Sequence, residues 1–178
     1  MAIFNPYFEK VLKWEGGWAD DPSDKGGKTN MGVTLTTWKA QGWDNNHDGV
    51  IDDIDLRMAT KEQIAAICKK NYWDFVKGDQ IGHQLIAQNI VDFGWGSGPV
   101  TATKRVQRVL GVADDGKIGP GTLGAINNYP NQQELLMKLV NDRLAFLDAI
   151  IARDASQKRF EKGWKRRVYD MVDMPSPM

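Results

Sequence analysis

Residues 4–18 read FNPYFEKVLKWEGGW, a helical pattern that stops at two consecutive glycines. Asn5 is a favourable N-cap, and Pro6 suits the first helical position. Three apolar residues and Glu15 follow at spacings that place them on one stripe of the helix. Because the glycines then end the helix, the pattern predicts a carboxylate on the apolar face of its last turn.

Glu15 has the surroundings expected of a general acid. Apolar burial and the negative end of the helix dipole both disfavour a charged carboxylate, so we expect Glu15 to hold its proton more readily than an exposed glutamate. A glycosidase needs such a proton donor beside the scissile oxygen, with a second group to steer water or stabilise the developing positive charge. These residues alone leave an alternative open, in which Glu15 pairs with Lys or Arg or turns into solvent.

Helical patterns dominate the rest of the chain. They cover residues 36–43, 60–76, 83–98, 99–112 and 132–155, whereas strand signal is confined to a short stretch. We therefore expect a mainly α fold with at most a small β-hairpin near residues 28–35.

The composition argues against a nucleic-acid-binding protein and against a membrane-spanning one. The 178 residues carry 23 Lys or Arg and 23 Asp or Glu, a balance that argues against nucleic acid as a partner. No apolar stretch approaches the roughly 20 residues of a membrane span, so we expect no transmembrane segment. The first ten residues lack the features of a signal peptide, which predicts synthesis in the cytoplasm without one. The single cysteine, Cys68, lies in an apolar helical pattern and is expected to be a buried, unreactive thiol.

Residues 44–55 read DNNHDGVIDDID and match the twelve-residue calcium loop of EF-hand proteins. Gly49, at the sixth position, permits the sharp turn of such loops. Oxygen ligands are predicted at positions 1, 3, 5, 7, 9 and 12, which hold Asp44, Asn46, Asp48, the Val50 carbonyl, Asp52 and Asp55. Asp at the last position is a departure from the usual Glu. We predict a structural Ca²⁺ here and no cofactor for catalysis, with a solvated acidic turn as the alternative.

Residues 14–34, WEGGWADDPSDKGGKTNMGVT, resemble the signature of glycoside hydrolase family 108, the lysozyme-like muramidases of phages and bacteria. The matching pattern is E-G-G, then D-P, then D-x-G-G-x-T-N-x-G-V-T. NYWDF at 71–75 is similar to the Y-W-D segment of that family, and residues 92–126 resemble its predicted peptidoglycan domain. Gly96 stands where members of the family often have Asn.

The resemblance implies a lysozyme-like helical fold and a reaction. Residues 1–93 would form the catalytic lobe, with the calcium loop as an insertion, and residues 94–178 a peptidoglycan-binding lobe packed with it as one globular unit. The reaction would be hydrolysis of the β-1,4 bond between N-acetylmuramic acid and N-acetylglucosamine. The catalytic glutamate of the family falls on Glu15, and Asp24, Thr29 and Asn30 are candidates for placing the water.

The predicted partner is peptidoglycan, bound by a monomer. Side chains that could stack on sugar rings are Trp18, Trp38, Tyr72, Trp73 and Trp95. The enzyme would act as an endolysin on the cell wall or in the periplasm, after holin-like or other export. Two alternatives stay open, a non-catalytic peptidoglycan-binding module and an accessory protein for secretion or phage release.

Overall fold

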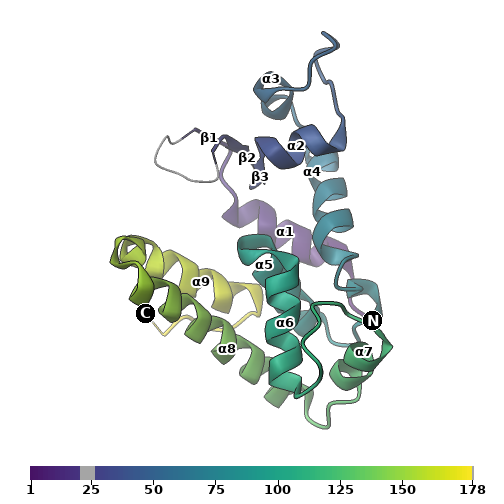
Figure 1. Cartoon of the computed structure of the whole chain (residues 1–178), viewed down its shortest axis with the longest axis vertical. Coiled ribbons are helices and arrows are strands. Elements are labelled where there is room, and N and C mark those ends of the chain that lie inside the picture. The colour runs from purple at the N-terminus through teal and green to yellow at the C-terminus, as the bar shows by residue number, and fades with distance from the viewer. Residues whose placement is uncertain (21–26, 178) are drawn as a thin grey trace. The chain divides into compact units, whose positions relative to one another are not determined.

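The computed structural model describes residues 1–20 and 27–177 and is mainly α-helical (Figure 1). Within these residues it has nine α-helices and a three-stranded antiparallel sheet, so the predicted fold class is confirmed. The chain divides into a small unit, residues 8–69, and a large unit, residues 1–7 together with 70–178. The boundary predicted between residues 93 and 94 lies inside a helix of the large unit, and the two-lobe division stays a prediction.

The small unit combines short helices with two-residue strands. Its elements are the later part of α1 (Phe4–Trp14), β1 (Trp18–Ala19), β2 (Thr29–Asn30), β3 (Val33–Thr34), α2 (Leu35–Gln41), α3 (Asp53–Arg57) and α4 (Lys61–Cys68). The β2–β3 pair is the hairpin predicted near residues 28–35, and β1 adds a strand that the sequence did not indicate. Helix α1 begins at Phe4, so Asn5 lies in its first turn and the prediction of an Asn5 N-cap is wrong.

Polar side chains start the helices of the small unit, and apolar ones fill its interior. Thr34 caps α2, and Thr60 forms a capping box with Gln63 at the start of α4, as expected for Thr at an N-cap. The buried apolar side chains of the unit's described residues are Phe8, Val11, Val33, Trp38, Leu56, Ile64, Ile67 and Cys68. The thiol of Cys68 is buried, as predicted, and its lack of reactivity stays a prediction.

The large unit is built around one central helix. It contains all but the first residue of a π-helical turn at Lys69–Trp73, a 3₁₀ turn at Gly78–Gln80, α5 (Gln84–Ser97), α6 (Pro99–Leu110), α7 (Pro120–Asn127), α8 (Gln132–Arg153), a 3₁₀ segment at Ala155–Phe160 and α9 (Glu161–Met171). Helices α6, α8 and α9 pack against α5, which is buried from Ile86 to Gly94 (Figure 1). A side chain at Gly94 would place its Cβ 3.2 Å from Pro99 Cα, so glycine there lets α5 and α6 approach closely without displacing Pro99.

A buried ion cluster joins three helices of the large unit. Asp92 of α5 is fully buried and bonds to Arg143 of α8 at 2.6 Å and to Arg167 of α9 at 2.8 Å. Burial alone would raise the pKa of Asp92, but the charges of Arg167 and Arg143 outweigh it and hold that pKa below its ordinary value. The cluster therefore depends on a charged carboxylate inside the helical core.

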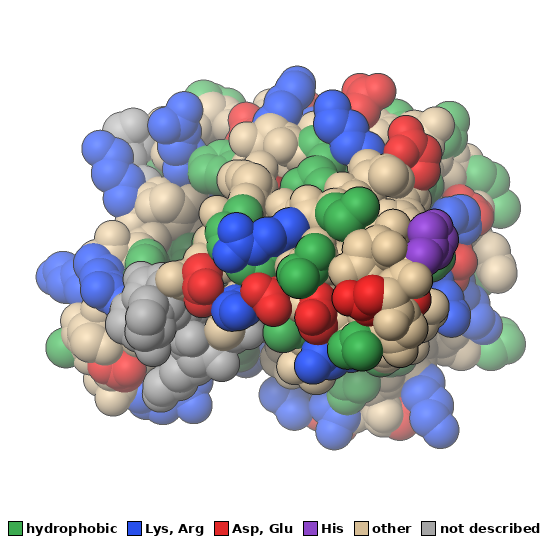
Figure 2. Space-filling model, turned by 90° about the horizontal axis from the view of Figure 1, so that it is seen from above, with side chains coloured by type: hydrophobic (Ala, Val, Ile, Leu, Met, Phe, Trp, Pro, Cys, Tyr) green, Lys and Arg blue, Asp and Glu red, His purple; other side chains and the backbone are tan. Residues whose placement is uncertain are grey.

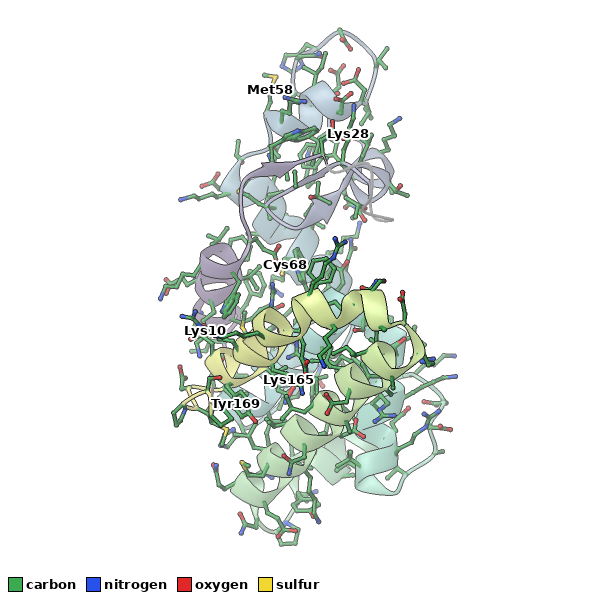
Figure 3. All side chains as sticks on the ribbon, turned by 90° about the vertical axis from the view of Figure 1, so that its left-hand side faces the viewer. Lys10, Lys28, Met58, Cys68, Lys165 and Tyr169 are labelled. Atoms are coloured by element: carbon green, nitrogen blue, oxygen red, sulfur yellow. The ribbon has the colours of Figure 1, made fainter. Side chains whose placement is uncertain are left out.

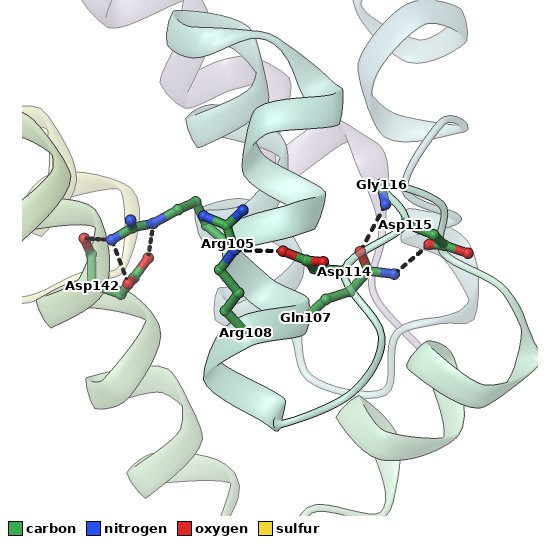
Figure 4. Close-up of polar contacts among 7 residues, drawn as sticks. All are labelled: Arg105, Gln107, Arg108, Asp114, Asp115, Gly116 and Asp142. Carbon is green, nitrogen blue, oxygen red and sulfur yellow. Dashed lines mark hydrogen bonds and ion pairs between the residues drawn. The ribbon is translucent and has the colours of Figure 1, made fainter.

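The DDGKIGPGT stretch, residues 114–122, is a turn organised by the buried Gln107 (Figure 4). The Gln107 side-chain nitrogen donates to Asp115 Oδ1 at 2.7 Å and to Thr122 Oγ1 at 3.1 Å, and its oxygen accepts the Gly116 N–H at 2.9 Å. Gly116 has φ 79°, a left-handed conformation that favours glycine. The glycines and polar residues of this motif thus have a structural role in the turn.

Candidate active site

Glu15 lies at the junction between α1 and the sheet. Its backbone N–H donates to the Val11 carbonyl at 2.8 Å, which continues the hydrogen-bond ladder of α1 by one residue. The side chain is half-buried rather than enclosed, so the apolar burial expected from the helical stripe is only partial. Two glycines separate it from β1, and this short link keeps Glu15 close to the first strand.

The sheet brings predicted site residues from two parts of the sequence together. Trp18 of β1 lies opposite Asn30 of β2, and Ala19 lies opposite Thr29. Trp18 and Thr29 are half-buried. Asp24 lies outside the described residues. The catalytic roles of Glu15, Asp24, Thr29 and Asn30 stay predictions.

The Asn30 side chain fastens β2 to the end of α3. Asn30 is buried, and its amide nitrogen donates to the Leu56 carbonyl at 2.8 Å and to the Arg57 carbonyl at 3.4 Å. The last carbonyls of a helix lack the usual partners inside the helix; Asn30 adds a donor to the Leu56 carbonyl, which also accepts the Ala59 N–H, and reaches the Arg57 carbonyl. Asn30 therefore has a structural partner whatever its part in catalysis.

Arg57, the last residue of α3, lies over the Trp18 ring with its guanidinium carbon 3.9 Å from the ring centroid. The neighbouring cation, Lys28, instead bonds to Asp53 at 2.8 Å. That hydrogen bond raises the pKa of Lys28 and lowers the pKa of Asp53. Figure 3 labels Lys28 and Met58, and Met58 marks the position of Arg57, the residue directly before it in the chain. Sequence reasoning missed Arg57, because its contact with Trp18 spans 39 residues and no local motif marks it.

Two of the predicted sugar-stacking aromatics are core residues in this structure. Trp38 is fully buried, with its ring centroid 5.3 Å from that of Trp43. Trp73 is also fully buried, stacks on Tyr7 at 6.0 Å and donates from its indole nitrogen to Asp79 at 2.8 Å. Neither indole offers an exposed face to a glycan.

Tyr72 and Trp95 differ from these two because both are half-buried. Their ring centroids are 4.8 Å apart, within the large unit. The pair keeps partly open aromatic surface, so its role in sugar stacking stays a prediction, as does that of Trp18.

The loop of residues 44–55 has the backbone expected of a calcium loop. Gly49 has φ 84° at the sharp turn. At positions 3, 5 and 9, the side-chain oxygens of Asn46, Asp48 and Asp52 each accept the N–H two residues further on, at 2.7–3.0 Å. Asp52 thereby caps α3. Figure 2 shows acidic side chains beside hydrophobic ones on the face seen from above.

The first and last residues of this loop are bound to its backbone. Asp44 accepts two N–H groups of the turn, at 2.8 and 3.2 Å. Asp55 is fully buried and accepts three N–H groups, from Asp52, Asn46 and Asn45. The N–H of Asp52, followed by the other two, lowers the pKa of Asp55 against the opposing effect of burial.

Across residues 1–20 and 27–177, no three His, Cys, Asp or Glu side chains lie close enough together to hold a metal ion. The loop backbone fits a calcium site, whereas its carboxylates stabilise the turn and the start of α3. These hydrogen bonds leave lone pairs on the Asp44 and Asp55 carboxylates that an ion could use, and calcium binding stays a prediction.

Residues 8–98 match the family model described as Glycosyl hydrolase 108. The chain belongs to this family. Residues 101–169 of this family 108 protein match a second model, described as Predicted Peptidoglycan domain. The protein is also similar to a solved structure, that of Brucella abortus SagA, with 34% sequence identity, a TM-score of 0.80, and coverage of 96% of this chain and 91% of that chain. No curated protein matches it.

These matches confirm the resemblance seen in the sequence and support a peptidoglycan hydrolase of the glycoside hydrolase class, with peptidoglycan as its partner. Among the described residues of the family 108 protein, no helix has both the length and the apolar character needed to cross a membrane.

Proposed function

We propose that this family 108 hydrolase is an N-acetylmuramidase that cleaves the β-1,4 bond between N-acetylmuramic acid and N-acetylglucosamine, with Glu15 as its general acid. The proposal rests on the position of Glu15, which lies within the part of the chain that matches the family model. It is a half-buried carboxylate at the end of α1, joined by two glycines to the strand whose Trp18 lies opposite Asn30.

In this reaction Glu15 gives its proton to the glycosidic oxygen as the bond to the anomeric carbon breaks. A water then adds to that carbon and gives a proton to a carboxylate of the site, either Asp24 or the Glu15 that has just lost its own. Asp24, Thr29 or Asn30 would place this water, and Thr29 offers a hydroxyl from β2 beside the strand of Trp18. General acid catalysis of this kind typically contributes about 10²–10⁴-fold to the rate.

The proposal is tested with purified Glu15→Gln protein and peptidoglycan, by analysis of the new reducing ends. We expect wild type to release muramic acid ends and Glu15→Gln to be slower by about 10²-fold or more, because an amide cannot donate the proton. Glu9→Gln is the matched control, since Glu9 is an exposed glutamate on the same helix, and its activity should equal that of wild type.

Other outcomes would reassign the protein. If wild type cuts nothing yet sediments with the wall, the chain is a binding module. Equal cutting by wild type and Glu15→Gln would remove Glu15 from the mechanism. Glucosamine ends in place of muramic acid ends would identify the other β-1,4 bond as the target. An accessory role in secretion or phage release would keep the dependence on Glu15 and appear only in cells.

The proposal also includes a structural calcium ion in the loop of residues 44–55 and a place of action outside the cytoplasm. Ca²⁺ would be a structural ion, held by Asp44, Asn46, Asp48, the Val50 carbonyl, Asp52 and Asp55, and would take no part in catalysis. The regular side-chain to backbone bonds of this loop at positions 3, 5 and 9 support it. The enzyme would act where its polymer lies, in the cell wall or periplasm, after holin-like or other export.

A further inference from the structure

Arg57 and Lys28 both lie close to the sheet, but Arg57 contacts an aromatic ring whereas Lys28 contacts a carboxylate. Lys28 is neutralised by its 2.8 Å bond to Asp53, a carboxylate that also feels the charge of Arg57. Within the described part of the chain, Arg57 forms no ion pair, and its guanidinium carbon lies 3.9 Å from the Trp18 ring centroid. Stacking on an aromatic face leaves the in-plane N–H donors of a guanidinium available for a carboxylate.

The position of Arg57 is fixed by its backbone as well as by its side chain. Trp18 lies opposite Asn30 in the sheet, and the Asn30 amide holds the carbonyls of Leu56 and Arg57. The strand that carries the indole is thus tied, through one buried side chain, to the helix end that carries the guanidinium. An exposed Arg with this degree of restraint loses little conformational entropy when it binds a ligand.

Arg57 is also near the candidate catalytic carboxylate. Trp18 lies three positions after Glu15, a backbone span of at most about 11 Å. A glycan strand with its scissile bond at Glu15 that runs along β1 would pass within reach of the Arg57 side chain. The muramic acid units of that strand carry a lactyl side arm, which ends either in its own carboxylate or in a stem peptide with carboxylates.

We infer that Trp18 and Arg57 form an anion-binding subsite, in which the Arg57 guanidinium binds a carboxylate on the lactyl side arm of muramic acid while its face stays against the indole. This rests on the proposed function in its choice of polymer and reaction. A guanidinium binds a carboxylate through two parallel N–H···O bonds, a geometry that a lysine ammonium cannot reproduce. The subsite would make the enzyme prefer acidic glycan strands to neutral ones of equal length.

The test compares Arg57→Gln with wild type on native peptidoglycan and on peptidoglycan whose carboxylates have been converted to amides. On the native polymer we expect KM to rise about tenfold for Arg57→Gln, with kcat changed less than about twofold, because a binding contact is lost. On the amidated polymer the two proteins should have the same KM. Arg57→Lys should recover only part of the loss, and Lys61→Gln, which removes an exposed charge of the same unit, should behave as wild type.

A third substrate separates the two sources of the carboxylate. Glycan strands stripped of peptides by an amidase expose the lactyl carboxylate alone. Dependence on Arg57 with stripped strands would identify that carboxylate as the ligand, and dependence with intact peptidoglycan alone would identify the stem peptide. An equal penalty for Arg57→Gln on native and amidated polymer would overturn the proposal, and so would a matching penalty for Lys61→Gln.

A binding measurement with inactive protein tests the subsite without depending on whether Glu15 is the general acid. Sedimentation with native peptidoglycan is measured for Glu15→Gln protein with and without Arg57→Gln. About tenfold weaker binding by the double variant would support the subsite even if Glu15 proves not to be the acid. Equal binding, with both proteins folded by circular dichroism, would reject the subsite whatever the fate of the muramidase.

Discussion

The small and large units are stabilised in different ways. The large unit has long helices around a buried α5, and its principal buried polar contact is the ion cluster of Asp92, Arg143 and Arg167. The small unit has strands of two residues and a five-residue helix, joined by side-chain to backbone hydrogen bonds. The candidate active site lies in the small unit. Its geometry should therefore be sensitive to single polar substitutions that cost little global stability.

The largest expected effect is on the large unit. Asp92→Asn should lower the free energy of unfolding by about 3–5 kcal/mol, because it leaves two buried or partly buried guanidinium groups without their carboxylate. Chemical denaturation measures this. Asp142→Asn is the control, because Asp142 pairs with Arg105 in a partly exposed site (Figure 4) and its loss should cost about 1 kcal/mol or less.

The same cluster predicts acid sensitivity. Because the folded state lowers the pKa of Asp92, its stabilisation is complete above the unfolded pKa of about 3.9 and is lost as pH falls through the folded value. Unfolding of Asp92→Asn should therefore depend less on pH below about 4 than that of wild type. Equal losses of unfolding free energy for Asp92→Asn and Asp142→Asn would show that the buried cluster contributes no more to the stability of the large unit than a partly exposed ion pair.

An intermediate effect is expected from Asn30→Ala in the small unit. Loss of its two hydrogen bonds to the end of α3 should cost about 1–2 kcal/mol and lower kcat/KM about tenfold, since Arg57 would no longer be held over Trp18. Asn131→Ala in the large unit removes the cap of α8, at a similar cost of about 1 kcal/mol, and should leave activity unchanged.

The size of the activity loss in Asn30→Ala also shows whether Asn30 positions Arg57 or places the catalytic water. A tenfold loss, mainly in KM, is expected of a residue that positions Arg57. A loss of about 10²-fold or more in kcat would instead support Asn30 as a residue that places the catalytic water. An equal activity loss in Asn131→Ala would contradict the idea that the site responds to the small unit alone.

The sequence predicted most of the helices because their signals are local, but it missed the five-residue α3 and extended α4 beyond Cys68. The Thr60 cap, the apolar periodicity before Cys68 and Gly98 at the end of α5 are each readable within a few residues, and the structure has helices at these places. Strand β1 was not predicted, because a two-residue strand carries almost no periodicity. The burial of Trp38 and Trp73 and the stacking of Arg57 on Trp18 were missed for another reason. These depend on contacts between distant residues, and the sequence pattern of an aromatic residue does not tell a core position from a binding surface.

The smallest expected effect concerns the 44–55 loop. Because its turn is already organised by its own carboxylates, calcium should add stability without being needed for folding. A calcium concentration ten times the dissociation constant would add roughly 1.4 kcal/mol, and so raise Tm by about 3–6 °C. Magnesium should have less effect, because this loop offers an irregular set of oxygen ligands rather than an octahedral one.

Asp44→Ala decides whether the loop causes such a shift. Asp44 accepts two N–H groups of the turn, so this variant should begin with a lower Tm than wild type, and the informative quantity is the change in Tm on adding calcium. We expect that change to vanish in Asp44→Ala and to persist in Glu62→Ala, whose carboxylate is exposed on α4. The same shift in both variants would place the ion elsewhere. No shift in wild type at about 1 mM calcium would mean that the carboxylates of this loop serve its backbone alone, as the buried Asp55 with its three N–H partners already does.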